Sequence, residues 1–288
     1  MKLAKVQVTN FRSVEDSGVF EIGDMTCLVG KNEAGKTAIL KAIHGLDPID
    51  DFSYDRTRDY PRRYLSKFDE RHSNGESPVA RTWWQLDDAD VADLEELLGD
   101  GVLNRREIEI TSYIGRKGTT WLVPLDEKKC LANLEARHGL NSKDKGILRS
   151  AEKSQDALTI LKEQQERSAA QEALLQALTK FRDGSAVRAA IDLLAKRKPQ
   201  FFYTSHFERM SGEVSLNKLA SDKQNNSVSI GDRIFLDFLE YAGTTIEELR
   251  DATKYEDLVA QCEGASNDIT DEIFEFWSQN EALSVKIE

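Results

Sequence analysis

The chain has 288 residues, of which 39 are basic and 51 acidic, giving a formal net charge of −12. This charge argues against a surface built throughout for nucleic acid, while a local basic patch on an acidic body stays compatible with it. The three cysteines, Cys27, Cys130 and Cys262, lie far apart in no metal-ligand spacing, which argues against a disulfide framework. With no signal-peptide pattern at the start and no apolar run of membrane-spanning length, a cytoplasmic protein without membrane contact is expected.

The first predicted elements are strands. Residues 4–8 alternate between apolar and polar side chains, which predicts a half-buried strand, and Phe20 and Ile22 indicate a second, short one. The apolar run at residues 25–29 is typical of a buried strand in a parallel sheet.

A glycine-rich motif follows this run. Residues 30–37 read G-K-N-E-A-G-K-T and match G-x-x-x-x-G-K-[ST], the phosphate-binding loop called Walker A. Good helix formers come next, with Gly45 suited to a left-handed cap and Pro48 preventing continuation. The loop thus lies between a predicted strand and a predicted helix, the context that separates this motif from the alternative, a glycine-rich turn before a helix.

The motif predicts a nucleotide site. The start of a helix offers backbone N–H groups and the positive end of the helix dipole to a phosphate. Lys36 is predicted to reach the β- and γ-phosphates, and the Thr37 hydroxyl to bind Mg²⁺. ATP and Mg²⁺ are therefore the expected cofactors. The residues expected to bind them in this segment are Gly30, Asn32, Glu33, Ala34, Gly35, Lys36, Thr37 and Ala38.

An irregular, charged stretch follows the predicted helix, from residue 47 to residue 78. Its arginines Arg56, Arg58, Arg62 and Arg63 offer contacts to DNA phosphates or to a partner. Acidic residues are interleaved with them, which favours the alternative, a solvated loop with balanced charges.

Regular patterns resume at residue 80. Residues 80–86 predict a strand, Asp87 or Asp88 a helix cap, and residues 107–123 a β-hairpin that turns at residues 115–118. Adjacent residues on a strand point to opposite faces, so one of Trp83 and Trp84 is expected in the core.

The middle of the chain is predicted to be helical. Residues 126–198 are rich in Ala, Leu, Glu, Gln and Lys and lack proline, with a break near residues 183–185. A heptad pattern fails after Leu158 and Leu161, which favours packed or projecting helices over a long coiled coil.

Further along the chain, residues 200–203 predict a buried strand that adds to the sheet containing the strand at residues 25–29. Residues 221–229 predict a polar loop. Thr244 and Glu247 suggest a capping box, residues 269–278 a helix, and the alternation at residues 283–287 a final strand.

Three segments together resemble a known family. V-Q-V-T-N-F-R-S at residues 6–13, followed by an asparagine-containing Walker A, is similar to the amino-terminal lobe of the SMC, RecF and OLD group of ABC-type ATPases. D-Y-P-R-R at residues 59–63 looks like OLD-type ATPases. Residues 199–212 are similar to the segment that re-enters the sheet after the helical arm in this group.

The resemblance implies an α/β fold, a P-loop NTPase of the ABC/SMC-like type, with a mixed sheet, an antiparallel β subdomain and a helical insertion. Residues 1–125 would form the ATP-binding lobe with Walker A and the hairpin. Residues 126–198 would form the helical insertion, as an arm or hairpin. Residues 199–288 would return to the ATPase core and add helices.

The resemblance also implies roles for residues outside the loop. It places Arg12 and Ser13 against the nucleotide and Asn32 near the γ-phosphate. The family has a glutamine after the helical arm that senses Mg²⁺ and the γ-phosphate, whereas residues 204–208 here read T-S-H-F-E. His206 or Glu208 is the candidate replacement, and an ordinary loop histidine is the alternative reading of His206.

Two parts of the family are missing from the sequence. No signature motif is present, because S-G-E at residues 211–213 is too short, and no Walker B is present, because I-F-L-D-F-L-E at residues 234–240 reads better as a helix. No residue that orients the attacking water is identified. These gaps and the final half-strand lead us to expect an amino-terminal piece that ends before both motifs, rather than an edge strand at a natural terminus.

The resemblance implies Mg-ATP binding and, once the missing motifs or a partner subunit complete the site, ATP hydrolysis in DNA processing, repair or anti-phage defence. It also implies a homodimer or higher homo-oligomer, with a nuclease as partner or fused domain and DNA as a candidate ligand. The isolated chain is expected to bind nucleotide and hydrolyse it poorly. The alternative is a nucleotide-dependent interaction module that docks a nuclease or other partner without turnover.

Overall fold

The computed structural model describes residues 1–49, 52–204, 213–225, 227–241 and 243–251, and short helical pieces at 259–260, 262–264, 266–268 and 270–271. The chain divides into two compact units, Met1–Tyr203 and Thr204–Glu288. None of the helices in the described ranges is long and apolar enough to cross a bilayer.

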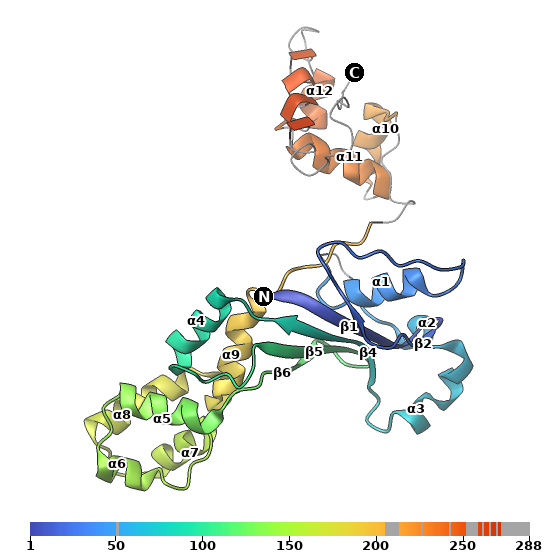
Figure 1. The fold of residues 1–288 in the computed structure, drawn as a ribbon. Helices are drawn as coiled ribbons and strands as arrows, with labels where there is room; N and C mark the ends of the chain where they lie inside the picture. The colour runs from blue at the N-terminus through green and yellow to red at the C-terminus, as the bar shows by residue number, and fades with distance from the viewer. Residues whose placement is uncertain are drawn as a thin grey trace. The chain divides into compact units, whose positions relative to one another are not determined.

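One antiparallel sheet forms the centre of the first unit (Figure 1). Its strands are β1 (Lys2–Phe11), β2 (Val14–Asp16), β3 (Phe20–Glu21), β4 (Ser77–Gln85), β5 (Glu107–Ile114) and β6 (Thr119–Leu122). They lie in the order β2-β1-β4-β5-β6, and β3 also pairs with β1. The strands predicted at residues 4–8 and 80–86 and the hairpin at 107–123 are therefore confirmed.

The parallel part of the expected mixed sheet is not seen among the described residues, where every named strand pair is antiparallel. Residues 25–29 form no strand, and the Met25 and Val29 side chains are 93% and 89% exposed. A buried parallel strand needs neighbouring strands along its edges. No described residue takes that place, so the strand prediction at 25–29 is wrong for this structure.

The strand predicted at residues 200–203 is also wrong. Phe201 makes a single parallel bridge with Pro48, outside the named strands. Its N–H donates to the Asp47 carbonyl at 2.8 Å, and its carbonyl accepts from Ile49 N–H at 3.2 Å. Phe202 is 74% exposed. The loop after α1 pairs with this segment, and the loop is not part of the sheet.

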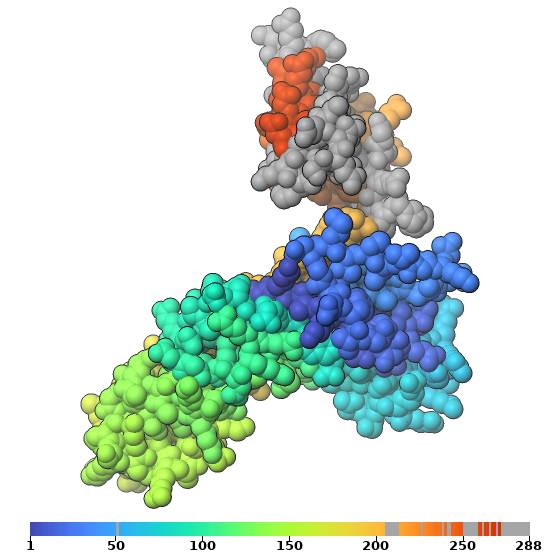
Figure 2. All heavy atoms as spheres, in the orientation of Figure 1, coloured from blue at the N-terminus to red at the C-terminus, as the bar shows by residue number. Residues whose placement is uncertain are grey.

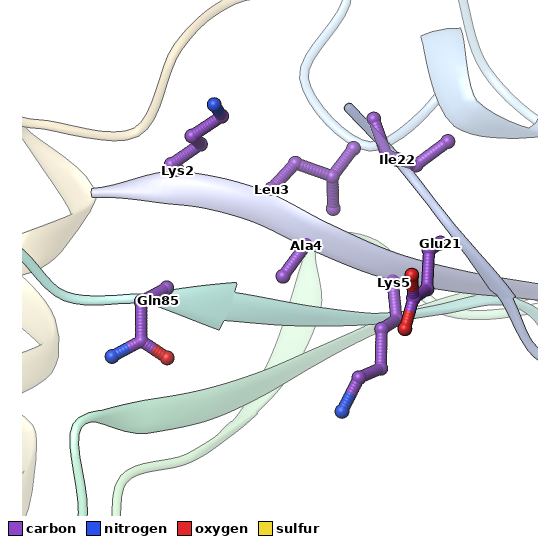
Figure 3. A pocket seen from close by; sticks show the side chains of 7 residues that line it. All are labelled: Lys2, Leu3, Ala4, Lys5, Glu21, Ile22 and Gln85. Atoms are coloured by element: carbon purple, nitrogen blue, oxygen red, sulfur yellow. The ribbon is translucent and has the colours of Figure 1, made fainter. Parts of the chain in front are cut away.

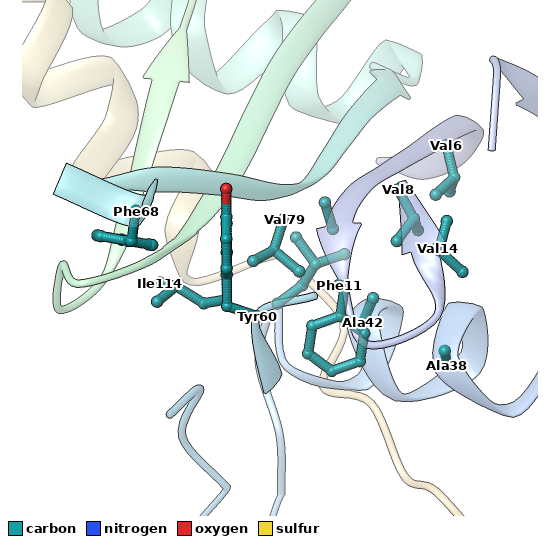
Figure 4. Close-up of a cluster of buried hydrophobic side chains, with 12 residues drawn as sticks. Val6, Val8, Phe11, Val14, Ala38, Ala42, Tyr60, Phe68, Val79 and Ile114 are labelled. Atoms are coloured by element: carbon teal, nitrogen blue, oxygen red, sulfur yellow. The ribbon is translucent and has the colours of Figure 1, made fainter. Parts of the chain in front are cut away.

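Helix α1 (Lys36–His44) packs against β1 and closes the first core (Figure 4). Short elements on the same side are α2 (Arg56–Asp59), a 3-10 helix (Arg62–Lys67) and α3 (Phe68–Arg71). Alternate residues of β1 enter this core, as the strand period requires. Its buried side chains include Val6, Val8, Phe11, Val14, Ala38, Ala42, Tyr60, Phe68, Val79 and Ile114.

Helix α1 ends where predicted, but for a different reason. Gly45 has φ −68°, outside the left-handed region expected for it. A Cβ on Gly45 would lie 2.5 Å from atoms of the Tyr54 side chain, so close approach is what requires glycine here. The Tyr54 hydroxyl donates to the Ala42 carbonyl at 2.6 Å and lies 3.1 Å from Ser112 Oγ, which ties the end of α1 to the sheet.

Helices build the other end of the first unit. They are α4 (Asp88–Leu98), α5 (Glu127–Arg137), α6 (Ser142–Ile147), α7 (Ser154–Glu163), α8 (Ala169–Thr179) and α9 (Ala186–Ala195). Figure 2 shows α5–α8 gathered in a compact group away from α1. The 3-10 turn Arg182–Gly184 is the break expected near residues 183–185. Trp84 is fully buried and Trp83 is not, as the strand alternation predicts.

The second unit contains α10 (Leu216–Gln224), α11 (Ile230–Tyr241) and α12 (Ile246–Asp251). Residues 234–240 are helical, as read from the sequence, and α10 covers part of the predicted polar loop. The capping box uses Thr245 and Glu248, one residue later than predicted, because Thr245 Oγ1 accepts from Glu248 N–H at 3.2 Å. The strand predicted at residues 283–287 lies outside the described residues, as does most of the helix predicted at 269–278.

Candidate functional site

The glycine-rich loop leads directly into α1. Gly35 precedes the first helical residue with φ 91°, and a Cβ on it would lie 2.9 Å from Val14 Cγ2. Glu33 also has a positive φ, 67°. Gly35 is therefore required both by its left-handed backbone and by the close approach of β2. This requirement holds the loop against the turn that joins β1 and β2.

A hollow of about 720 Å³ lies beside the start of α1. That volume is in the range of small-molecule sites, a few hundred to about 1,000 Å³. Two segments far apart in the sequence line it, the β1–β2 turn and the loop with the first turn of α1. The lining residues are Arg12, Ser13, Asn32, Glu33, Gly35, Lys36, Thr37 and Ala38. Of the residues expected at the nucleotide, Gly30 and Ala34 do not line the hollow and lie within the same loop.

The start of α1 has the free N–H groups and the positive charge that bind an anion. No side chain caps it, and its first turn contains no acidic residue. The Lys36 ammonium donates to the carbonyls of Gly30, at 2.8 Å, and Lys31, at 2.7 Å, so it lies over the loop. The Thr37 side chain is exposed one residue further along the helix. Backbone amides, an ammonium group and a hydroxyl therefore converge on one hollow, which fits a nucleotide's terminal phosphates.

The residues also fit the expected magnesium ion. No group of three or more His, Cys, Asp or Glu in the described part of the chain lies close enough together to hold a metal ion. Mg²⁺ in nucleotide sites is commonly held by one or two protein oxygens together with the substrate phosphates. The Thr37 hydroxyl is a suitable single protein ligand of that kind.

Asp59 fixes Arg12 at the rim of this hollow. Arg12 has φ 53°, and its N–H donates to the Asp59 carbonyl at 2.6 Å. Its Nε and Nη2 each lie 2.9 Å from Asp59 Oδ1. The Asp59 side chain is fully buried and also accepts from Asp55 N–H at 2.9 Å. Burial raises the pKa of Asp59, but hydrogen bonds from Arg58, Asp55 N–H and Arg12 outweigh it and hold that pKa below its usual value.

Sequence reasoning did not assign this role to Asp59. The residue lies within D-Y-P-R-R at 59–63, among acids and bases that read as a balanced loop. Arg12 has a left-handed backbone, and its N–H donates to the Asp59 carbonyl. These two features bring the Asp59 carboxylate against the Arg12 guanidinium. In the sequence, the only indication of this role is the number of arginines close to Asp59.

The four arginines predicted to contact DNA or a partner do not act as one group. Arg58 and Arg62 line a second hollow of about 590 Å³, together with Arg12, Ser13 and Tyr60. Arg56 instead pairs with Asp69 at 2.8 Å and stacks over Phe68, and Arg63 lies near Glu15 at 3.6 Å and over Tyr64. The candidate sensors His206 and Glu208 lie outside the described residues.

A smaller hollow of about 240 Å³ lies on β1 away from the loop (Figure 3). Its side chains come from β1, β4 and the end of β3, and Lys2 and Lys5 point to opposite sides of β1. Lys5 is paired with Glu107 at 3.1 Å. Because the polar groups do not converge, this hollow is not a candidate site.

A glycine loop that leads into a helix, with a lysine and a hydroxyl residue in the first turn, fits a nucleotide-binding domain of α/β fold. Residues 1–70 match a family described as the AAA ATPase domain. This match supports an AAA-type ATPase and, with it, nucleotide binding.

A curated relative gives a second, more distant comparison. Over 104 residues the chain is 29% identical to the uncharacterized protein MJECL44 of Methanocaldococcus jannaschii. The match covers 34% of this chain and 30% of the relative, so the chain spans less than a third of the relative's length in this alignment.

Proposed function

We propose that this chain is the Mg-ATP-binding lobe of an ABC-type ATPase that resembles the OLD and SMC-like proteins. The observation that carries the proposal is that Lys36, Thr37 and Arg12 line one hollow at the uncapped start of α1. The match of residues 1–70 to the AAA ATPase domain supports it independently.

In this proposal the chain's residues bind and orient the nucleotide. Lys36 and the loop amides hold the terminal phosphates, and Thr37 holds the metal ion. Arg12, fixed from behind by Asp59, places a second cation at the rim. Bound Mg-ATP supplies the phosphoanhydride bond whose hydrolysis would follow. Hydrolysis requires parts beyond this hollow, supplied by the missing motifs or by another subunit in a homodimer or higher oligomer. By resemblance, the assembled protein acts in DNA processing, repair or defence against phage, with a nuclease fused or in trans.

A second candidate is a nucleotide-dependent interaction module without turnover. The observation that favours it is the scarcity of carboxylates in the hollow, where Glu33 is the single acidic lining residue. Glu33 lies on the phosphate loop itself. A lobe without a base to orient water would bind ATP as a switch for a docked partner.

Titration calorimetry of the full 288-residue chain with Mg-ATP tests the proposal. We expect measurable binding, and we expect Lys36→Ala to weaken it at least about tenfold, since a charged hydrogen-bond donor is lost. Lys41→Ala is the matched control, because Lys41 lies on the same helix with its ammonium over the Tyr203 ring. A folded wild-type chain that gives no heat with Mg-ATP would overturn the proposal. Phosphate release separates the two candidates, because only the ATPase shows turnover with the completing partner.

A further inference from the structure

We propose that Arg12, Arg58 and Arg62 form a second anion site, next to the nucleotide hollow, that binds the phosphodiester backbone of a nucleic acid. Binding of the backbone depends on these arginines alone. Its link to ATP rests on the proposed function, because that link requires a nucleotide in the neighbouring hollow.

The charges around this hollow do not cancel. It is lined by three guanidinium groups, and the nearest carboxylate is Asp59, which is shared by Arg12 and Arg58. Arg62 is exposed and makes no ion pair, hydrogen bond or ring contact with any described residue. Asp55 also acts on Arg58, so two carboxylates stand against three cations, which leaves a positive surplus at this place on an acidic protein.

The same stretch of chain contains arginines that are engaged by a carboxylate or by an aromatic ring. Arg56 is held between Asp69 and the Phe68 ring, and Arg71 lies over the Tyr64 ring at 4.1 Å. Arg63 has Glu15 as its neighbour. Arg56 and Arg63 therefore differ from Arg62, since a carboxylate faces each of them.

The two paired arginines are held from behind with their outer faces open. Arg58 Nη2 donates to the Ser53 carbonyl at 3.0 Å and lies 3.1 Å from Asp59 Oδ2, yet its side chain is 59% exposed. The Arg12 side chain is 30% exposed. A guanidinium fixed in this way loses little conformational entropy when it binds a phosphate. Arginine contacts a phosphate through two parallel N–H donors.

The lining favours a backbone over a base or a small molecule. Tyr60 is fully buried and its hydroxyl lies 3.1 Å from His72 Nε2, so it offers no exposed ring for base stacking. The remaining lining groups are guanidinium groups and the Ser13 hydroxyl, all suited to phosphate oxygens. Contacts of this kind position a strand without reading its sequence.

Arg12 and Ser13 line both hollows. A phosphate in one hollow and a nucleotide in the other would compete for the same guanidinium and repel each other. Binding at two sites that share a group is reciprocally coupled. We expect Mg-ATP to weaken nucleic-acid binding about fivefold or more, the low end of typical coupling.

Fluorescence anisotropy of a labelled single-stranded oligodeoxynucleotide, titrated with the full chain without nucleotide, tests the site. Each phosphate contact adds about 0.7 to the slope of affinity against salt for a single strand. We expect Arg62→Gln to weaken binding and reduce this slope by about 0.7, and the Arg58→Gln/Arg62→Gln pair to reduce it by about twice that amount. Arg62→Lys retains the charge and should retain the slope.

Arg56→Gln is the matched control and should leave both affinity and slope unchanged, because Arg56 is engaged by Asp69. Equal losses in Arg56→Gln and Arg62→Gln, or an unchanged Arg62→Gln, would overturn the proposal. So would equally tight competition by polyglutamate or by millimolar inorganic phosphate, which would indicate general anion binding. Calorimetry with Mg-ATP separates the two proposals, since Arg62→Gln should bind ATP as the wild type does. Oligonucleotide binding without ATP binding would refute only the proposed function.

Discussion

The two ends of the first unit differ in how their helices begin and in how much apolar side chain they expose. In the helical end, α4, α6 and α8 begin with capping boxes, and Lys128 and Glu152 pair at 2.9 Å. The most exposed large apolar side chain of helices α4–α9 is Ile147, at 37%. At the loop end, α1 begins uncapped, Arg62 is unpaired among the described residues, and Val29 is 89% exposed.

The loop end is therefore the part of the first unit that is open to a ligand or partner. A helix start without a cap and an apolar run without a neighbour leave groups that a partner or ligand can satisfy. An exposed cation without a carboxylate costs little by itself and is free to bind an anion. The helical end has capped helix starts and no exposed apolar run. It does contain cations without an ion pair among the described residues, such as Arg149 and Lys180, so an unpaired cation alone does not distinguish the two ends. Substitutions at matched positions of the two ends test this difference.

Loss of a buried carboxylate should give the largest effect at either end. Asp59 is fully buried against Arg12, and Asp90 is fully buried against the Met1 ammonium at 2.7 Å and Arg197 at 3.2 Å. We expect Asp59→Ala and Asp90→Ala each to lower the free energy of unfolding by about 3 kcal/mol in urea titrations, because a backbone N–H and two cations lose their shared carboxylate in each case.

Only Asp59→Ala should also weaken Mg-ATP binding, about tenfold, since only Asp59 positions a group at the nucleotide hollow. Asp59→Asn and Asp90→Asn repeat the comparison if the alanine variants do not fold. Equal losses of ATP affinity in the Asp59 and Asp90 variants would show that Asp59 acts through general stability.

A glycine exchange should give an intermediate effect. Gly35 and Gly139 both have positive φ, 91° and 70°, but an added Cβ meets Val14 at 2.9 Å in one case and nothing within 4 Å in the other. We expect Gly35→Ala to cost about 1–3 kcal/mol and Gly139→Ala about 1 kcal/mol in chemical unfolding. Gly35→Ala should also reduce ATP affinity, whereas an unchanged affinity would mean that the loop tolerates a shift away from β2.

A valine exchange should show the smallest effect at the loop end. Val29→Thr should change the free energy of unfolding by less than about 0.5 kcal/mol, because the side chain is exposed. The same change at the fully buried Val8 should cost about 1–3 kcal/mol, since a hydroxyl then enters the core. Thermal or urea unfolding measures both. A large loss in Val29→Thr would mean that residues 25–29 are covered in solution.

Much of the fold could be predicted because its signals are local. The alternation of β1, the hairpin of β5 and β6, the cap of α4 and the helix after the loop were each readable from a few neighbouring residues. The loop residues Gly35, Lys36 and Thr37 carry their chemistry in a fixed spacing, so their convergence beside one helix start followed from the motif.

The failures share one cause. Residues 25–29 and 200–203 have strand-like composition, but a strand exists only where another strand pairs with it. Gly45 was read as a cap, although the Tyr54 ring is what excludes a side chain there. In each case the deciding contact comes from a distant part of the chain.

Spacing and periodicity along the chain are enough to specify the phosphate loop, the strands at residues 4–8 and 80–86, the hairpin at residues 107–123 and the helical composition of the middle region. Only the tertiary structure decided that Asp59 supports Arg12, that Arg62 is left unpaired while Arg56 is not, and that residues 25–29 have no neighbour. The physical reason is that burial and ion pairing depend on which distant groups meet, and interleaved charges on one loop allow several pairings until the fold selects one.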